Sequence, residues 1–179
     1  MDALRIEGLT KKYGDKIAVD NLNLSIPYGS IYGIVGPNGA GKTTTLTMVC
    51  GITKPDAGTA WIAGHETGTL ESKKAMGLLM DGAPVFEKLS GAEYLQYLGA
   101  LRSMAEEEVQ ERSRELLSAL GLADAATKYI GDYSAGMTKK ILLAGAILHD
   151  PEVLILDEPL EAVDPVSSRM VQQLLRSYA

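Results

Sequence analysis

A glycine-rich stretch, Gly36–Thr44 with the sequence GPNGAGKTT, carries the clearest chemistry in the chain. Gly36–Thr43 matches the pattern G-x-x-x-x-G-K-[ST]. The apolar run Ile31–Val35 before it is typical of a buried strand, and helix-forming residues follow from Lys42. Glycines let successive backbone N–H groups point at phosphate oxygens, and a helix start adds positive potential. The stretch predicts a nucleotide site; the alternative is a turn that only joins a strand to a helix.

The roles of single residues in this loop follow from the chemistry of phosphoryl transfer. We expect the catalytic lysine, Lys42, to reach the β- and γ-phosphates and the Thr43 hydroxyl to ligate Mg²⁺. The predicted nucleotide contacts in the loop are Gly36, Asn38, Gly39, Ala40, Gly41, Lys42, Thr43 and Thr44.

Two carboxylates follow another apolar run near the end of the sequence. Val153–Leu156 is typical of a buried strand, and Asp157 and Glu158 come directly after it. Open α/β sheets bind ligands beyond the C-terminal ends of their strands, and adjacent strand residues point in different directions. We therefore expect Asp157 to hold the magnesium shell and Glu158 to polarise the attacking water as the catalytic base. The alternative is a solvated acidic pair that ends a core strand.

The coarse pattern of the chain indicates an α/β core with a helical insertion. Apolar residues alternate at Leu22, Leu24 and Ile26, and Met76–Met80 is a further apolar strand. Ser90–Glu93 has the spacing of a capping box before an apolar helix, and a second helix is expected from about Ala105. The middle of the chain, about 82–149, is therefore predicted to be helical.

Composition narrows the function classes. The chain has 179 residues, 46% of them hydrophobic, and a net charge of −6, which argues against nucleic acid as the main partner. The paired lysines, among them Lys139–Lys140, are interpreted as solvated faces. The single cysteine, Cys50, allows no internal disulfide and is expected to be buried. Because no apolar run reaches membrane-spanning length and no signal peptide is recognisable, a cytosolic chain is expected.

A second glycine-containing turn also leads into a helix-forming run. Gly131–Thr138, with the sequence GDYSAGMT, is a small polar turn that leads into the apolar run ILLAGAIL. Together with the glycine-rich loop 36–44, called the phosphate loop, and the two carboxylates that follow the strand 153–156, this stretch resembles the ATP-binding-cassette ATPases, in which a signature helix start contacts the γ-phosphate of ATP held by the other subunit. Tyr133–Met137 matches that signature, and the resemblance gives Ser134 and Gly136 the phosphate-facing positions.

Further residues take roles from the same resemblance, which covers nearly the whole chain. Tyr13 matches the aromatic residue that stacks on adenine, although a core tyrosine is the alternative. Asp164 matches a residue at the subunit junction, and an Asp-Pro turn that opens a helix fits the same sequence. Asp81 stands where the family usually has glutamine, and it is assigned to the catalytic and magnesium-binding residues with a shorter reach. Ala135 and Tyr133 depart from the signature.

The resemblance also predicts the fold and its limits. It implies a P-loop NTPase with a RecA-like core, an N-terminal antiparallel β subdomain and a helical insertion, in a single domain over 1–179. Residues 1–81 would form the β subdomain and phosphate-loop part, 82–149 the helical subdomain, and 150–179 the acidic strand with the following loop and helix. The family has a further strand and a histidine that this sequence lacks, so the C-terminal strands are expected to be missing. His65 and His149 are interpreted as surface or structural residues.

The function implied by the resemblance is that of an ATP-binding and ATP-hydrolysing subunit of a transporter. It would pair head to tail with a second copy or a paralogous subunit, use Mg²⁺, and power a membrane-spanning permease from the cytoplasmic face, weakly favouring export. One alternative is a regulatory cassette that binds ATP with little hydrolysis. Another is a soluble cassette ATPase acting on nucleic acid or ribosomes.

Overall fold

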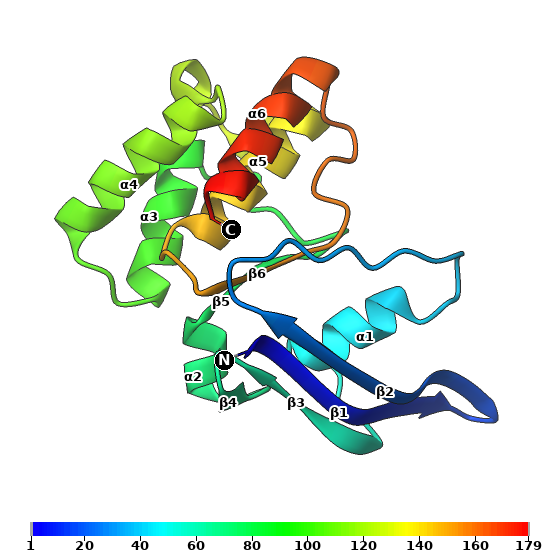
Figure 1. The fold of residues 1–179 in the computed structure, drawn as a ribbon. Helices are drawn as coiled ribbons and strands as arrows, with labels where there is room; N and C mark the ends of the chain where they lie inside the picture. The colour runs from blue at the N-terminus through cyan, green and yellow to red at the C-terminus, as the bar shows by residue number, and fades with distance from the viewer. Residues whose placement is uncertain (1, 179) are drawn as a thin grey trace. The chain divides into compact units, whose positions relative to one another are not determined.

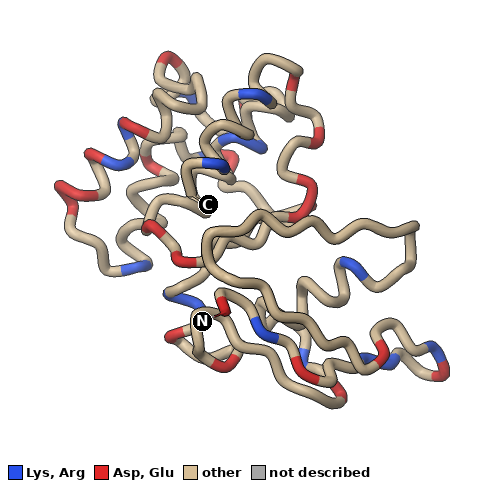
Figure 2. Tube along the Cα trace, viewed as in Figure 1, with Lys and Arg blue, Asp and Glu red and all other residues tan. Residues whose placement is uncertain are grey.

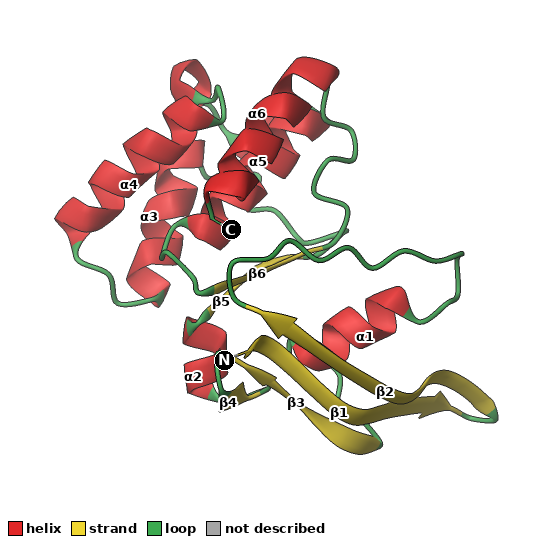
Figure 3. Cartoon of the chain, viewed as in Figure 1, coloured by secondary structure: helices red, strands yellow, loops and turns green. Residues whose placement is uncertain are grey.

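The computed structural model describes residues 2–178, which divide into two compact units (Figures 1 and 3). In the described part, the first unit contains residues 2–78 and 152–157, and the second contains residues 79–151 and 158–178. None of the helices in the described part is both long and apolar enough to cross a membrane.

The N-terminal part of the first unit is an antiparallel sheet. Its strands are β1 (Asp2–Tyr13), β2 (Lys16–Pro27), β3 (Ala57–Ile62) and β4 (His65–Glu66), in the order β2-β1-β3-β4. Each neighbouring pair runs antiparallel. In β2 the half-buried Leu22, Leu24 and Ile26 alternate with exposed residues, as the period of a sheet with one covered face requires. The predicted antiparallel β subdomain is confirmed.

The core of the first unit joins this sheet to a helix and a second, smaller sheet. Helix α1 (Lys42–Val49) starts at the phosphate loop. Strands β5 (Met76–Leu79) and β6 (Val153–Leu156) pair with each other, and α2 (Leu70–Lys74) precedes β5. The core is built from Leu4, Ile6, Leu9, Val19, Met48, Val49, Cys50, Ala60, Ile62, Ala75, Met76 and Ile155. As predicted, Cys50 is buried, and burial raises the pKa of its thiol to about 12.

The prediction of a buried strand at Ile31–Val35 is wrong. This segment is irregular and exposed, and the side chain of Val35 is 96% accessible. A strand needs neighbours to pair its N–H and C=O groups, and among residues 2–178 no strand pairs with this segment. Its apolar composition therefore does not lead to a strand here.

The second unit is helical. It contains α3 (Gly91–Leu101), α4 (Glu106–Ala119), α5 (Ala135–Ile147) and α6 (Pro165–Ser177), with short 3₁₀ turns at Ala123–Ala125 and Ile130–Asp132. The predicted capping box is present, because the Ser90 hydroxyl accepts from the Glu93 N–H and the Glu93 carboxylate accepts from the Ser90 N–H. Fully buried side chains in this unit include Leu95, Leu120, Leu122, Ile141 and Ile147. The predicted helical insertion is confirmed.

The interpretation of Lys139–Lys140 as a solvated pair is wrong. Lys140 is only 8% accessible, and its Nζ lies 3.4 Å from the Ser167 Oγ of α6. The Lys139 Nζ lies 3.4 Å from the Asp81 Oδ1. Both amines find partners far away in the sequence, which a local charge pattern does not reveal.

Candidate functional site

The phosphate loop leads into a helix whose first N–H groups no side chain caps. The residue before α1, Gly41, has a left-handed backbone with φ 88°, and it makes no side-chain capping bond. The first turn contains no acidic residue. The opening N–H groups of a helix have no partners inside the helix and carry its positive dipole end. The start of α1 therefore suits an anion such as a phosphate group.

Packing as well as backbone conformation requires glycine at position 41. A β-carbon added to Gly41 would overlap the carbonyl oxygen of Ala18 on β2. The left-handed backbone would also be strained for any residue with a side chain. The sheet thus holds the loop close at this point, and Gly41 allows that approach.

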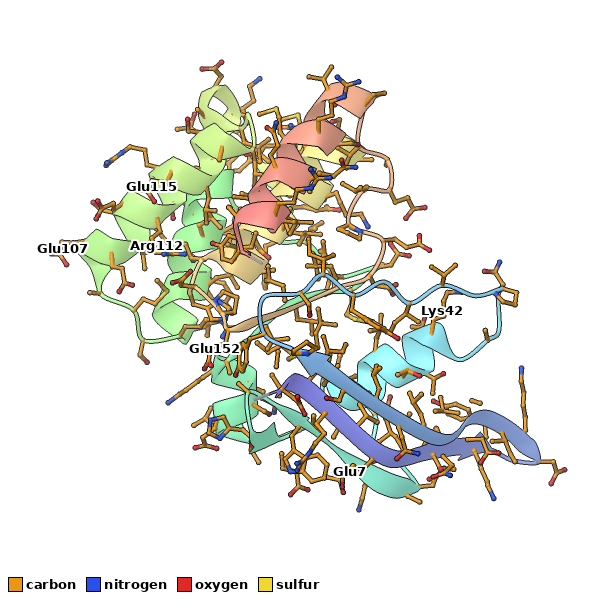
Figure 4. All side chains as sticks on the ribbon, in the orientation of Figure 1. Glu7, Lys42, Glu107, Arg112, Glu115 and Glu152 are labelled. Carbon is orange, nitrogen blue, oxygen red and sulfur yellow. The ribbon has the colours of Figure 1, made fainter. Side chains whose placement is uncertain are left out.

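Lys42 is folded back onto its own loop. Its Nζ donates to the Gly36 carbonyl oxygen at 2.7 Å and to the Pro37 carbonyl oxygen at 3.0 Å. Figure 4 shows the residue at the start of α1. A phosphate bound in the loop would offer charged oxygens in place of these neutral carbonyls, which makes stronger hydrogen bonds to an ammonium group. Thr43, the next residue, is exposed.

Tyr13 lies at the end of β1, beside the turn to β2. Its side chain is 52% accessible, which excludes the alternative of a core tyrosine. The Lys11 Nζ lies 5.6 Å from the centroid of its ring, within the range of a cation–π contact. An exposed ring at this position is available for stacking on a flat ligand.

Two side chains of the first unit carry oxygen atoms of the kind that magnesium prefers. Asp157 follows β6 and is half-buried, and Thr43 offers a hydroxyl oxygen. Mg²⁺ prefers oxygen ligands and is usually held by one or two carboxylates together with substrate phosphates. The donor types at Thr43 and Asp157 match that preference. Asp81 belongs to the second unit and has a different environment.

Glu158, in the second unit, has a strained backbone and acidic neighbours. Its φ is 50°, a left-handed conformation that costs a residue with a side chain about 1–3 kcal/mol. One carboxylate oxygen from each of Asp81, Glu158 and Glu161 lies within 4.8 Å of the others. Figure 2 shows further acidic residues along the segment between β6 and α6.

A lysine that the sequence did not assign to the site sits beside this acidic cluster. The Lys139 Nζ lies 3.4 Å from an Asp81 oxygen and 4.0 Å from a Glu161 oxygen. The lysine follows the predicted signature by two residues in α5, so the same helix start supplies a counter-charge to the acids. No local signal links Lys139 with Asp81, because they are 58 residues apart.

The predicted signature starts α5 with a conventional cap. The Ser134 Oγ accepts from the Met137 N–H at 3.3 Å. Gly136 faces the segment before α6, where an added β-carbon would lie 2.9 Å from the Ala162 carbonyl oxygen. Glycine at this position thus permits close backbone packing, while Ser134 itself stays exposed.

Tyr133, a departure from the family signature, has a structural role. Its ring is buried, and its hydroxyl donates to the Ala125 carbonyl oxygen at 2.7 Å. The ring also fills the space over Gly91, where a β-carbon would collide with the Tyr133 hydroxyl. The larger side chain therefore anchors the start of α5 to the rest of the helical unit.

Asp164 starts α6 in the way that the Asp-Pro turn predicts. Its carboxylate accepts from the Val166 and Ser167 N–H groups, each at 3.0 Å. The Ser167 side chain, together with these backbone donors, lowers the pKa of the Asp164 carboxyl below its usual value. The capping role is thus shown. The role at a subunit junction remains a prediction.

The candidate residues fall into one group per unit. Tyr13, the loop 36–44 and Asp157 belong to the first unit, whereas Asp81, Ser134, Gly136 and Glu158 belong to the second. His65 is exposed and His149 is half-buried.

Comparison with known proteins assigns a family. Residues 19–161 match the family model described as ABC transporter. The chain is 38% identical over 177 residues to the daunorubicin/doxorubicin resistance ATP-binding protein DrrA of Streptomyces peucetius, covering 98% of this chain and 54% of that protein. It is 37% identical over 176 residues to the bacitracin transport ATP-binding protein BcrA of Enterococcus faecalis, covering 96% of this chain and 56% of that protein. The chain thus spans about half the length of these relatives.

Two solved structures share the fold. One is described as an ATP-binding subunit of an ABC transporter, with a TM-score of 0.91, 23% identity and coverage of 98% of this chain and 74% of that one. The other is a dimer of the ATP-binding cassette MJ0796 in a post-hydrolysis state, bound to ADP and Pi. It has a TM-score of 0.85 and 26% identity, and it covers 96% of this chain and 81% of that one.

Proposed function

Because this chain belongs to the ABC transporter family, we propose that it binds and hydrolyses ATP in a head-to-tail dimer and thereby powers a separate membrane permease. The observation that carries the proposal is the start of α1, where Gly41 leaves the first N–H groups of the helix uncapped and Lys42 stands beside them. Such a site complements the negative charge of a nucleotide's phosphates.

The binding roles within the first unit follow from its donor groups. The N–H groups of the loop 36–44 would hold the phosphates, Lys42 would exchange its loop carbonyls for phosphate oxygens, and the exposed Tyr13 ring would stack on the base. Thr43 and Asp157 would ligate Mg²⁺, which would neutralise negative charge on the nucleotide's phosphates.

Hydrolysis is assigned to the second unit's acidic cluster. We place the general base at Glu158, because a carboxylate can accept a proton from the attacking water. Asp81 belongs to the same cluster and is proposed to take part in catalysis, for which its ion pair with Lys139 would have to open. The strained backbone at Glu158 is consistent with a position held for function.

The start of α5, with Ser134 and Gly136, is proposed to bind the nucleotide that a second copy or a paralogous subunit holds. One chain already has its own phosphate loop, and the related cassette MJ0796 has been solved as a dimer. ATP binding would then close the dimer, and hydrolysis would release it.

The permease would dock on the second unit near the loop 81–89. Phe86 is 46% accessible and Tyr97 is 42% accessible, and their ring centroids lie 5.2 Å apart in an edge-on arrangement. Exposed aromatic side chains are enriched in protein interfaces. The name of one relative, a daunorubicin/doxorubicin resistance protein, favours export. The chain would be held at the inner face of the cell membrane through this partner.

Replacement of the proposed base tests the assignment. Glu158→Gln in the protein at its full encoded length should reduce ATP turnover by about 10²- to 10⁴-fold, because the amide cannot accept the proton. The affinity for Mg-ATP should change little. Phosphate release and ATP binding are measured separately, with Glu161→Gln in the same acidic cluster as the matched control. Unchanged turnover in Glu158→Gln would show that the base lies elsewhere.

A further inference from the structure

The C-terminal end of α5 is bound by a side chain from another helix. Arg112 of α4 donates from Nε to the Leu148 carbonyl oxygen at 2.6 Å and from a terminal nitrogen to the Ile147 carbonyl oxygen at 3.3 Å. The last carbonyls of a helix have no partner inside it, and a cation there offsets the negative end of the dipole. The last turn of α5 contains no basic residue of its own. Arg112 therefore supplies the charge that α5 lacks (Figure 4).

The same guanidinium reaches the end of α6. It donates to the Tyr178 hydroxyl oxygen at 3.4 Å, and Tyr178 is the residue at which α6 ends. It also lies 3.5 Å from a carboxylate oxygen of Asp150. The Arg112 side chain is largely shielded from solvent, which strengthens such contacts relative to surface pairs. One group thus connects the C-terminal ends of α5 and α6.

The N-terminal ends of the two helices also meet. Gly136 in the first turn of α5 packs against the Ala162 carbonyl oxygen, just before α6. Farther along both helices, the Lys140 Nζ lies 3.4 Å from the Ser167 Oγ. These contacts follow one another in the same order along both helices, so α5 and α6 run in the same direction (Figure 1). Ser134 and Asp164, which cap them, lie at one end, and Arg112 lies at the other.

Because a helix is stiff, a displacement of one of its ends also moves the other end. Helix α5 is roughly 20 Å long at 1.5 Å per residue, so a tilt of about 3° at its C-terminal end moves its start by about 1 Å. Misplacement of that size is enough to weaken a phosphate contact severely. The geometry of the far end therefore matters for Ser134.

We propose that Arg112 is a positioning residue, which fixes the α5–α6 pair so that Ser134 meets the nucleotide of the second subunit. This inference rests on the proposed function of the α5 start as a site for a partner's ATP. Arg112 touches no nucleotide itself, and it should act on the closure of the dimer rather than on the binding of ATP to the chain's own loop.

The test separates these two steps. All proteins are expressed at full encoded length and carry Glu158→Gln, so that ATP is not consumed. The dissociation constant of ATP is measured at protein concentrations below dimerisation, and the dissociation constant of the dimer is measured by sedimentation in saturating Mg-ATP. Arg112→Ala and Arg112→Lys are compared with Arg114→Ala, an exposed arginine on the same helix.

We expect Arg112→Ala to raise the dissociation constant of the dimer about tenfold, the usual order for losing a charge-assisted contact, while the ATP constant stays within about twofold. Arg112→Lys should recover part of the loss, because a cation remains near the end of α5. Arg114→Ala should change neither constant.

Either of two results with Arg112→Ala overturns the proposal. An unchanged dissociation constant of the dimer in Arg112→Ala would rule out the positioning role. A similar rise in the dissociation constants of the dimer and of ATP would indicate general unfolding instead. If Arg112→Ala fails to fold, Arg112→Lys carries the test, and an unchanged dimer constant in that variant contradicts the proposal. If the protein with Glu158→Gln alone forms no dimer in Mg-ATP, the proposed function is wrong, and this inference is then wrong as well.

Discussion

The starts of α1 and α5 look alike in sequence, yet they treat their first N–H groups differently. Each follows a small, glycine-containing turn, and neither first turn contains an acidic residue. At α1 the preceding residue is Gly41, which leaves the N–H groups without a side-chain partner. At α5 the Ser134 hydroxyl already accepts from the Met137 N–H.

The start of α1 therefore has N–H groups without a side-chain partner, whereas the start of α5 has an N–H group paired with its own serine. An uncapped helix start gains its missing partners only from an anion or water. At a capped start the serine hydroxyl already accepts a hydrogen bond from an N–H group. A ligand must therefore form a stronger hydrogen bond than the hydroxyl does, as a charged phosphate held by a second subunit can. We therefore propose that the start of α1 binds the chain's own nucleotide and that the start of α5 acts in dimer closure.

The largest expected effect distinguishes the two glycines. Gly41→Ala should lower the free energy of unfolding by about 2–4 kcal/mol, because it combines a left-handed backbone with overlap on Ala18. Gly136→Ala should lower the free energy of unfolding by about 1 kcal/mol. The added β-carbon would lie 2.9 Å from the Ala162 carbonyl oxygen, and the backbone of Gly136 is not left-handed. Urea unfolding without nucleotide measures both. Equal losses would mean that the two starts are packed alike.

A charge change then tests which start binds the chain's own nucleotide. Lys42→Ala should weaken Mg-ATP binding by about 10- to 100-fold, because it removes the charged donor to the phosphates. Lys128→Ala, an exposed lysine in the second unit, is the matched control and should leave binding unchanged. Calorimetry gives both affinities. Full ATP affinity in Lys42→Ala would place the nucleotide somewhere other than the α1 start.

The smallest expected effect concerns the cap of α5. Ser134→Ala should lower the free energy of unfolding by about 1 kcal/mol in the absence of nucleotide, the usual value for losing an N-cap. Ser118→Ala, on the exposed side of α4, should be neutral or slightly stabilising, because alanine favours helices. Thermal unfolding compares the two. A neutral Ser134→Ala would mean that the hydroxyl does not satisfy the start of α5.

Features with short-range signals were predictable from the sequence. The phosphate loop, the capping box at Ser90 and the Asp164 turn each depend on residues within a few positions, and the structure has all of them. The helical insertion also followed from local apolar periodicity. In these cases residues close together in the sequence set the structure.

Features that depend on distant partners were not predictable. The run Ile31–Val35 has the composition of a buried strand, but a strand forms only where another strand pairs with it. Lys139 meets Asp81 across 58 residues of sequence, and Arg112 meets Leu148 across 36. Neither contact leaves a local pattern, so the sequence predicts a solvated lysine pair and indicates no role for Arg112.

The most direct test of the account mixes two inactive proteins at full encoded length. Lys42→Ala lacks its own nucleotide site, and Ser134→Arg blocks the site offered to a partner. If α5 serves the other subunit, the mixture contains one intact pair, and the two differently tagged proteins should associate in Mg-ATP although neither associates with itself. No association in the mixture, or ATP-dependent self-association of Ser134→Arg, would contradict the assignment of α5 to the partner's nucleotide.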